Sequence, residues 1–190
     1  MNTHAETFYS FKDHFLIATP QINDPYFTHS VIYLFEHSPS GAMGVIINKP
    51  SPLKMEHLFK AIEKETPKQF REAWLLLGGP IQVDRGFLIH TPVGNWQSSL
   101  SINGKIAVTT SKDIIEGLFE ENSPIKSLAT VGYSAWEEGQ LEAELNENTW
   151  ITIPVDQTIM FDLPYHQRYE AALNSLGIKA QNIMAGIGHA

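Results

Sequence analysis

One segment of the chain, residues 30–36, is an uninterrupted run of β-branched, aliphatic and aromatic residues that reads Ser-Val-Ile-Tyr-Leu-Phe-Glu. A strand with one face in water alternates apolar and polar residues, and this segment does not, so we expect both of its faces to be covered. A second apolar run, residues 43–47, follows a turn that contains Pro39 and Gly41. The two runs therefore predict a β-hairpin inside the protein.

Shorter apolar segments predict further strands along the chain. The strongest signal is Asn103-Gly104 between residues 99–102 and 106–109, because this pair favours a hairpin with a type I′ turn, in which both residues have positive φ. Residues 81–85 are polar, and we interpret them as a connection between strands. The other predicted strands are residues 15–19, 74–77, 86–91, 127–133, 149–153 and 158–161.

Four segments have a helical pattern. Residues 53–70 place apolar side chains on one face. Two more helices are expected after Thr110 and after Ser134, each of which we interpret as an N-cap with an acid three residues later. Residues 167–176 predict a fourth helix, ended by Gly177. About eight to ten strands that alternate irregularly with four helices favour an α+β fold with a mixed sheet.

Length and charge narrow the class of protein. The chain has 190 residues, a formal net charge of −8 and no cysteine. We expect a single domain over residues 1–190, with a loose lead-in at 1–13 and a tail at 178–190. The negative charge disfavours direct contact with nucleic acid, and the lack of cysteine excludes disulfides and is compatible with a reducing compartment. The first ten residues do not resemble a signal peptide, and no apolar run approaches the roughly 18 residues of a membrane span, so we expect a soluble cytoplasmic protein.

The sequence offers little support for a metal or cofactor. The eight histidines include no pair at a metal-ligand spacing, and there is neither a Walker A loop nor a G-x-G-x-x-G motif. We therefore predict no metal and no cofactor. Gly78-Gly79-Pro80 fits a tight turn better than an anion cradle, and His90, at the end of an apolar segment, fits a hydrogen-bonded structural residue.

A corner between a strand and a helix is expected where the chain reads Gly132-Tyr133-Ser134-Ala135-Trp136-Glu137-Glu138-Gly139-Gln140. Such corners leave backbone amides free to bind ligands. Gly132-x-Ser134 also matches the first half of a nucleophile elbow, as in a hydrolase or transferase. Trp136 stands where that motif needs a second glycine, so we predict a helix cap at Ser134 and no catalytic residue.

Several blocks of the sequence are distinctive in combination: Gly41-Ala42-Met43-Gly44-Val45-Ile46-Ile47-Asn48-Lys49-Pro50, Leu77-Gly78-Gly79-Pro80, Asp84-Arg85-Gly86-Phe87, Thr109-Thr110-Ser111-Lys112-Asp113, Gly132-Tyr133-Ser134-Ala135-Trp136, Gly139-Gln140-Leu141-Glu142 and Gly188-His189-Ala190. In this order they cover nearly the whole chain and resemble the YqgE/AlgH family of bacterial proteins. The resemblance implies an α+β fold whose mixed sheet is bent toward a pseudo-barrel and flanked by helices. It implies little about activity, because no biochemical function is established for that family. The AlgH name reflects a proposed role in transcriptional control of alginate production.

Polar residues stand where apolar strands are predicted to begin or end. Asn48-Lys49 follows one buried strand, and Arg85, a planar donor suited to carboxylate or phosphate, precedes another. If these strand ends meet, they form a polar pocket walled by Trp136, suited to a small anionic ligand. The predicted site residues are Asn48, Lys49, Arg85, Thr110, Ser111, Trp136 and Gln140.

Three classes of function follow from these observations. The leading hypothesis is a non-catalytic binding or regulatory protein, which acts through this pocket or through a protein partner. The alternatives are a hydrolase or transferase that uses Ser134, and a transcriptional regulator, as the family name suggests. The sequence shows no helix-turn-helix pattern, zinc finger or basic helix, so such a regulator is expected to act without direct DNA contact.

Overall fold

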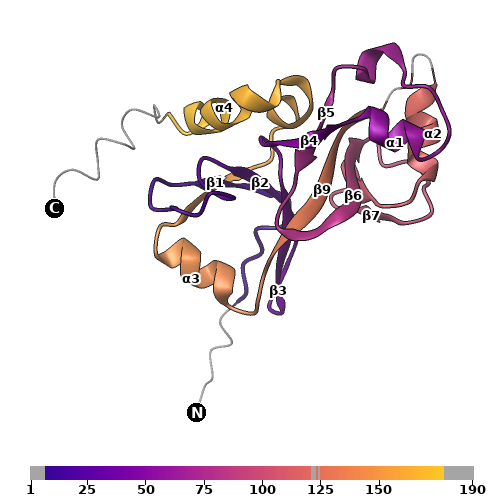
Figure 1. Cartoon of the computed structure of the whole chain (residues 1–190). Helices are drawn as coiled ribbons and strands as arrows, with labels where there is room; N and C mark the ends of the chain where they lie inside the picture. The colour runs from indigo at the N-terminus through magenta and orange to yellow at the C-terminus, as the bar shows by residue number, and fades with distance from the viewer. Residues whose placement is uncertain (1–6, 121–122, 124, 178–190) are drawn as a thin grey trace.

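Ten strands form one strongly curled sheet in the part of the chain that the structure, a computed structural model, describes: residues 7–177 apart from 121, 122 and 124 (Figure 1). The predicted tail at 178–190 and the first six residues of the predicted lead-in lie outside this part. The strands are β1 (His14–Ala18), β2 (Val31–Ser38), β3 (Gly41–Ile46), β4 (Pro50–Lys54), β5 (Trp74–Leu77), β6 (Ile81–Thr91), β7 (Ser99–Ser101), β8 (Ala107–Thr109), β9 (Lys126–Trp136) and β10 (Trp150–Pro154).

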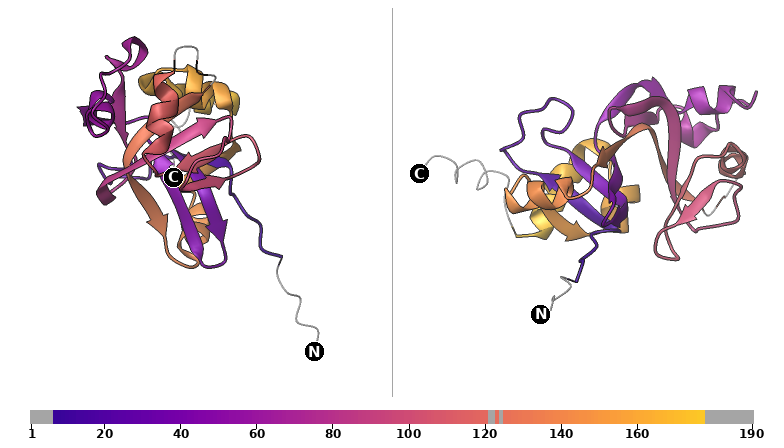
Figure 2. Two further views of the ribbon diagram at one scale, coloured as in Figure 1. Left: turned by 90° about the vertical axis from the view of Figure 1, so that its right-hand side faces the viewer. Right: turned by 90° about the horizontal axis from the view of Figure 1, so that it is seen from below.

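Strand β9 lies at the centre of the sheet. The order is β10-β1-β2-β3-β9-β6-β8-β7, and β5 also pairs with β9 and carries β4 at its side. The pair β5–β9 is parallel and the other described pairs are antiparallel, so the sheet is mixed. Figure 2 shows how strongly the sheet bends between its two halves. The α+β class and the bent mixed sheet expected from the sequence are confirmed.

Four α-helices flank the sheet in the described part of the chain. Helices α3 and α4 lie beside the half that holds β1 and β2, whereas α1 and α2 lie beside the other half (Figure 1). None of the described helices is long and apolar enough to cross a membrane. The helices are α1 (Glu56–Lys60), α2 (Asp113–Phe119), α3 (Gln140–Asn146) and α4 (Arg168–Ser175), with 3₁₀ turns at Lys68–Phe70 and Tyr165–Gln167 and a π-helical turn at Thr158–Asp162.

The predicted buried hairpin is formed by β2 and β3, which pair antiparallel. Val31, Tyr33 and Phe35 of β2 belong to a core cluster that α4 covers through Ala172 and Leu173. The alternate residues of the same strand, Ile32 and Leu34, belong to a second cluster that includes Leu141 of α3. Both faces of β2 are therefore covered, which explains why its sequence does not alternate.

The helix predicted for residues 53–70 is mostly wrong. Strand β4 ends at Lys54, and the α-helix that follows covers only five residues. Pro50 and Lys54 pair with β5, so this part of the apolar pattern is extended rather than helical. Pro67 is also extended, with ψ 148°, and only a 3₁₀ turn follows it. Tertiary pairing has here overridden a helical pattern in the sequence.

Three other local predictions are corrected. Residues 81–85 belong to β6 rather than to a connection, and the register against β9 shifts between Ile81 and Gly86, as expected of a β-bulge. Residues 158–161 form the π-helical turn and not a strand, because Asp156 Oδ1 accepts the backbone N–H groups of Thr158 and Ile159. Helix α2 begins at Asp113 without a side-chain cap, so Thr110 is not its N-cap.

The hairpin around Asn103-Gly104 is confirmed as the pair β7–β8, but its turn differs from the prediction. Gly104 has φ +77°, whereas Asn103 does not have positive φ, so the turn is not type I′. The Asn103 side chain accepts hydrogen bonds from the backbone N–H groups of Lys105 and Ile106 instead. An asparagine side chain that forms hydrogen bonds with the backbone of its own turn stabilises that turn.

Candidate functional site

Two of the predicted site residues, Trp136 and Gln140, line one pocket. Trp136 ends β9 and Gln140 begins α3, so the short connection between these elements places both side chains at the same edge of the sheet. The pocket has a volume of about 310 Å³, and we call it the indole pocket. Its lining residues are Ile22, Asn23, Asp24, Phe27, Ala135, Trp136, Gln140, Glu144, Thr149 and Trp150.

A single carboxylate organises the indole pocket. Glu144 Oε2 accepts hydrogen bonds from the indole Nε1 atoms of Trp136 at 2.9 Å and Trp150 at 2.7 Å. Its Oε1 accepts a third from Gln140 Nε2 at 3.0 Å. The two indoles are only 6% and 5% exposed and meet edge to face at 6.1 Å between ring centroids. Because both indole N–H groups need an acceptor when buried, Glu144 fixes the geometry of this aromatic wall.

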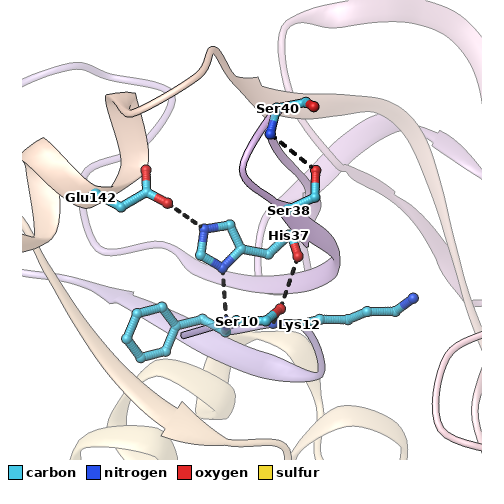
Figure 3. A network of polar contacts seen from close by, with 7 residues as sticks. Ser10, Lys12, His37, Ser38, Ser40 and Glu142 are labelled. Carbon is cyan, nitrogen blue, oxygen red and sulfur yellow. Dashed lines mark hydrogen bonds and ion pairs between the residues drawn. The ribbon is translucent and has the colours of Figure 1, made fainter. Parts of the chain in front are cut away.

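A second carboxylate holds α3 in place (Figure 3). The Phe11 backbone N–H donates to His37 Nδ1 at 2.8 Å, so the proton of the neutral ring is on Nε2 and is donated to Glu142 at 2.8 Å. The Ser10 hydroxyl donates to the His37 carbonyl. Residues 10 and 11, in the predicted loose lead-in, are therefore tied through His37 to α3, the helix that carries Gln140 and Glu144.

Asn48 and Lys49 support the opposite wall of the indole pocket without lining it. Lys49 Nζ donates to the carbonyl oxygens of Pro25 at 3.0 Å and Tyr26 at 2.6 Å, in the loop that supplies Asp24. Burial lowers the pKa of Lys49, and the nearby Asp24 carboxylate acts in the opposite direction. The Asn48 side chain accepts a hydrogen bond from the Val31 backbone N–H and donates one to the His29 carbonyl oxygen. Both side chains therefore hold the backbone of this loop.

Arg85, Thr110 and Ser111 do not join the other predicted residues. Arg85 is exposed on the β6 bulge, where it donates to Gln82 Oε1 and lies 5.4 Å from the centre of the Phe87 ring. Thr110 lines a separate hollow beside Phe87 and β7, and Ser111 bonds to residues 98 and 113 nearby. The seven residues thus do not line one pocket: Trp136 and Gln140 line the indole pocket, whereas Thr110 lines the separate hollow.

Ser134 is not on an exposed turn and does not cap a helix. It lies within β9, is 1% exposed, and its hydroxyl donates to the Gly78 carbonyl. The special backbone position is Gly132, with φ +73°, where a Cβ atom would lie 2.4 Å from the Gly79 carbonyl oxygen. Glycine is needed there because the β5–β6 turn approaches β9 so closely. The corner predicted at residues 132–140 is thus a strand that continues to Trp136.

The turn at Gly78 and the side chain of His90 are structural. The Gly78 N–H donates to the Val131 carbonyl, so it is not available to an anion. His90 is fully buried, with Nδ1 at 2.9 Å from the Pro92 carbonyl oxygen and Nε2 at 2.7 Å from the Thr109 hydroxyl, and burial lowers its pKa. Across the described residues, no three His, Asp or Glu side chains are arranged to hold a metal ion.

Most residues of the indole pocket could not be predicted from the sequence. Glu144 stands four residues after Gln140, so the i, i+4 spacing on α3 could have indicated that the two side chains meet. Trp150 and Phe27 come from β10 and from the loop before β2, and their rings lie 6.0 Å apart. No local pattern connects these residues, because their contact depends on the pairing of β1 with both β10 and β2.

Comparison with known proteins agrees with the fold. The profile of the AlgH-like family matches residues 15–181, and the chain belongs to this family. UPF0301 proteins from Neisseria meningitidis serogroup B and Chromobacterium violaceum are each 46% identical, over 94% and 95% of this chain and 98% of theirs.

Two solved structures are also similar. The solution structure of the AlgH protein from Pseudomonas aeruginosa covers 100% of both chains with a TM-score of 0.76 and 41% identity. A crystal structure of a Corynebacterium diphtheriae protein, 16% identical, covers 88% of both chains with a TM-score of 0.70 and shows the shared fold alone.

Proposed function

We propose that this protein is a non-catalytic binding protein and that the indole pocket takes a small organic molecule with a positively charged amine. One observation carries the proposal: the pocket has aromatic walls, and its only charged lining side chains in the described chain are the carboxylates of Asp24 and Glu144. Such a lining favours an organic ammonium ion. The aromatic rings attract it by cation–π contact, and the carboxylates attract it by Coulomb interaction.

The hydrogen bonds inside the pocket leave its negative charge in place. The three donors to Glu144 are two indoles and an amide, which are neutral, so they orient the carboxylate without cancelling its charge. Asp24 uses one oxygen to accept the backbone N–H of Tyr26. An ammonium group in the pocket would therefore meet two anionic side chains, and the net charge of −8 would also draw cations toward the protein.

The small anionic ligand predicted from the sequence does not suit this pocket. That prediction depended on Arg85, which lies elsewhere, and Lys49 spends its donors on backbone carbonyls. The charged side chains among the described lining residues are both carboxylates, so they would repel an anion, and the nearby cation Lys49 lies outside the lining. Direct DNA binding is disfavoured by the same sign of charge. A regulatory role in the cytoplasm, as the family name suggests, would act through ligand binding.

A matched pair of probes tests the proposal. Phenethylamine and phenylacetate both carry a phenyl ring and differ in the sign of their charge. Isothermal titration calorimetry measures the binding of each compound to the full-length protein. We expect phenethylamine to bind and phenylacetate not to bind at this pocket. The double variant D24N/E144Q should weaken amine binding about tenfold, a loss of about 1.4 kcal/mol.

Glu116→Gln provides the control for this experiment. Glu116 is exposed on α2, so its substitution changes the net charge without altering the pocket, and amine binding should be unchanged. An amine that binds the double variant as tightly as the unmodified protein would contradict the proposal.

A further inference from the structure

A second pocket surrounds a buried arginine. Arg168, the first residue of α4, is only 7% exposed. Its Nε donates to the Leu163 carbonyl at 3.1 Å, and its Nη1 donates to the Ile47 carbonyl. No carboxylate of the described residues forms an ion pair with this guanidinium. The two carbonyls orient the charge but do not neutralise it.

A buried charge without a counterion is uncommon, because removal from water costs several kcal/mol and is usually offset by an opposite charge. Burial lowers the pKa of Arg168 to about 10, so the side chain still carries its charge at neutral pH. The fold therefore keeps a positive charge in its interior, and the described part of the chain supplies no negative partner.

The pocket beside Arg168 has a volume of about 250 Å³ and apolar walls. The third guanidinium nitrogen, Nη2, makes no hydrogen bond within the described chain and is not fully buried. Arg168 lines the pocket, and Nη2 is its one nitrogen without a partner. We call this the Arg168 pocket. Its lining residues are Met55, Phe70, Glu72, Ala73, Trp74, Leu76, Ser127, Leu128, Ala129, Tyr165 and Arg168.

Two hydroxyl groups add to the donors of the Arg168 pocket. Ser127 of β9 and Tyr165 both line it, and neither hydroxyl makes a hydrogen bond among the residues that the structure describes. The one carboxylate in the lining, Glu72, is exposed and forms an ion pair with Lys54 at 2.9 Å, so a cation already balances its charge. Three unused donors, one of them charged, thus border an apolar cavity.

We infer that the Arg168 pocket binds a small monocarboxylate with an apolar body, the carboxylate on Arg168 and the body against Met55, Phe70 and Leu128. A carboxylate matches the charge and planarity of a guanidinium. The apolar walls favour one charged group attached to hydrocarbon over inorganic phosphate, which would need donors on every side. This inference concerns a different pocket and does not rest on the function proposed above.

The first test compares three probes by isothermal titration calorimetry on the full chain. We expect 3-phenylpropionate to bind, its neutral amide 3-phenylpropionamide to bind at least about tenfold more weakly, and inorganic phosphate to give no heat. Equal binding of acid and amide would overturn the role of the charge. Tighter binding of phosphate would overturn the monocarboxylate class.

Variants assign the acid to this pocket. Arg168→Gln should abolish binding of 3-phenylpropionate. Because Arg168 also joins Ile47, the residue after β3, to Leu163, a second variant separates ligand binding from folding. Ala73→Leu fills the pocket from the residue directly before β5 and leaves both bonds of Arg168 intact. It should reduce acid binding at least about tenfold while the far-ultraviolet circular dichroism spectrum stays unchanged.

Two controls complete the experiment. Arg85→Gln removes an exposed positive charge on the β6 bulge and should leave acid binding unchanged. Ala73→Leu should also leave phenethylamine binding unchanged, because the indole pocket shares no lining residue with the Arg168 pocket. A folded Ala73→Leu variant that binds 3-phenylpropionate normally would overturn the inference.

Discussion

The indole pocket and the Arg168 pocket hold a charged side chain in opposite ways. Glu144 receives three N–H donors from neighbouring side chains, and two of these come from indoles that are themselves buried. Arg168 meets two backbone carbonyls and retains an unused nitrogen. We therefore expect the loss of Glu144 to cost more stability than the loss of Arg168. Substitutions at the two positions test this contrast.

The largest loss of stability is expected for Glu144→Leu. The change leaves the indole N–H groups of Trp136 and Trp150 without an acceptor, and since each buried unsatisfied donor costs about 1–3 kcal/mol, we expect a loss of about 2–4 kcal/mol. Urea unfolding followed by circular dichroism measures it. In a Trp136→Phe background the same substitution should cost about 1 kcal/mol less, because one of the two donors is gone. A loss below about 0.5 kcal/mol would remove the folding role of Glu144.

Arg168→Met should cost less, about 1–2 kcal/mol. The carbonyls of Leu163 and Ile47 lose a donor, but the variant no longer has to bury a charge, and the two effects partly offset each other. The same urea experiment gives the value, and addition of 3-phenylpropionate should stabilise the unmodified protein but not this variant. If Arg168→Met proves more destabilising than Glu144→Leu, the contrast between the two pockets fails.

Lys49→Met should have the smallest effect, about 1 kcal/mol. It removes the donors to Pro25 and Tyr26 and so loosens the loop that forms one wall of the indole pocket. Hydrogen exchange should become faster at the backbone amide of Phe27. Lys12→Met, which removes only a surface pair with Glu36, serves as the comparison. Unchanged exchange in the loop would show that Lys49 does not hold it.

Much of the fold could be predicted because the apolar runs are long and belong to the interior. Residues 31–35 show no alternation since α3 and α4 cover the two faces of β2. The errors occur where a short segment could be paired or unpaired. Residues 53–54 follow a helical pattern but are drawn into β4 by β5, and residues 158–161 look like a strand but turn around Asp156. These outcomes depend on neighbours that the local sequence does not specify.

The candidate sites were predictable only in part, for the same reason. Trp136 and Gln140 are four residues apart, so their proximity follows from a strand that leads into a helix. Arg168 resembles an ordinary exposed residue at the start of an amphipathic helix. Its burial depends on the carbonyl of Ile47, which lies 121 positions earlier in the chain. No spacing rule in the sequence identifies Arg168 as a buried charge, because its burial depends on the curvature of the sheet.

Strand β9 contributes to both pockets, with Ser127, Leu128 and Ala129 near its start and Ala135 and Trp136 at its end. At about 3.3 Å per residue, the backbone at positions 128 and 135 can be separated by at most about 23 Å. Two guest molecules held at these places would thus keep a nearly constant spacing, fixed by one continuous piece of backbone.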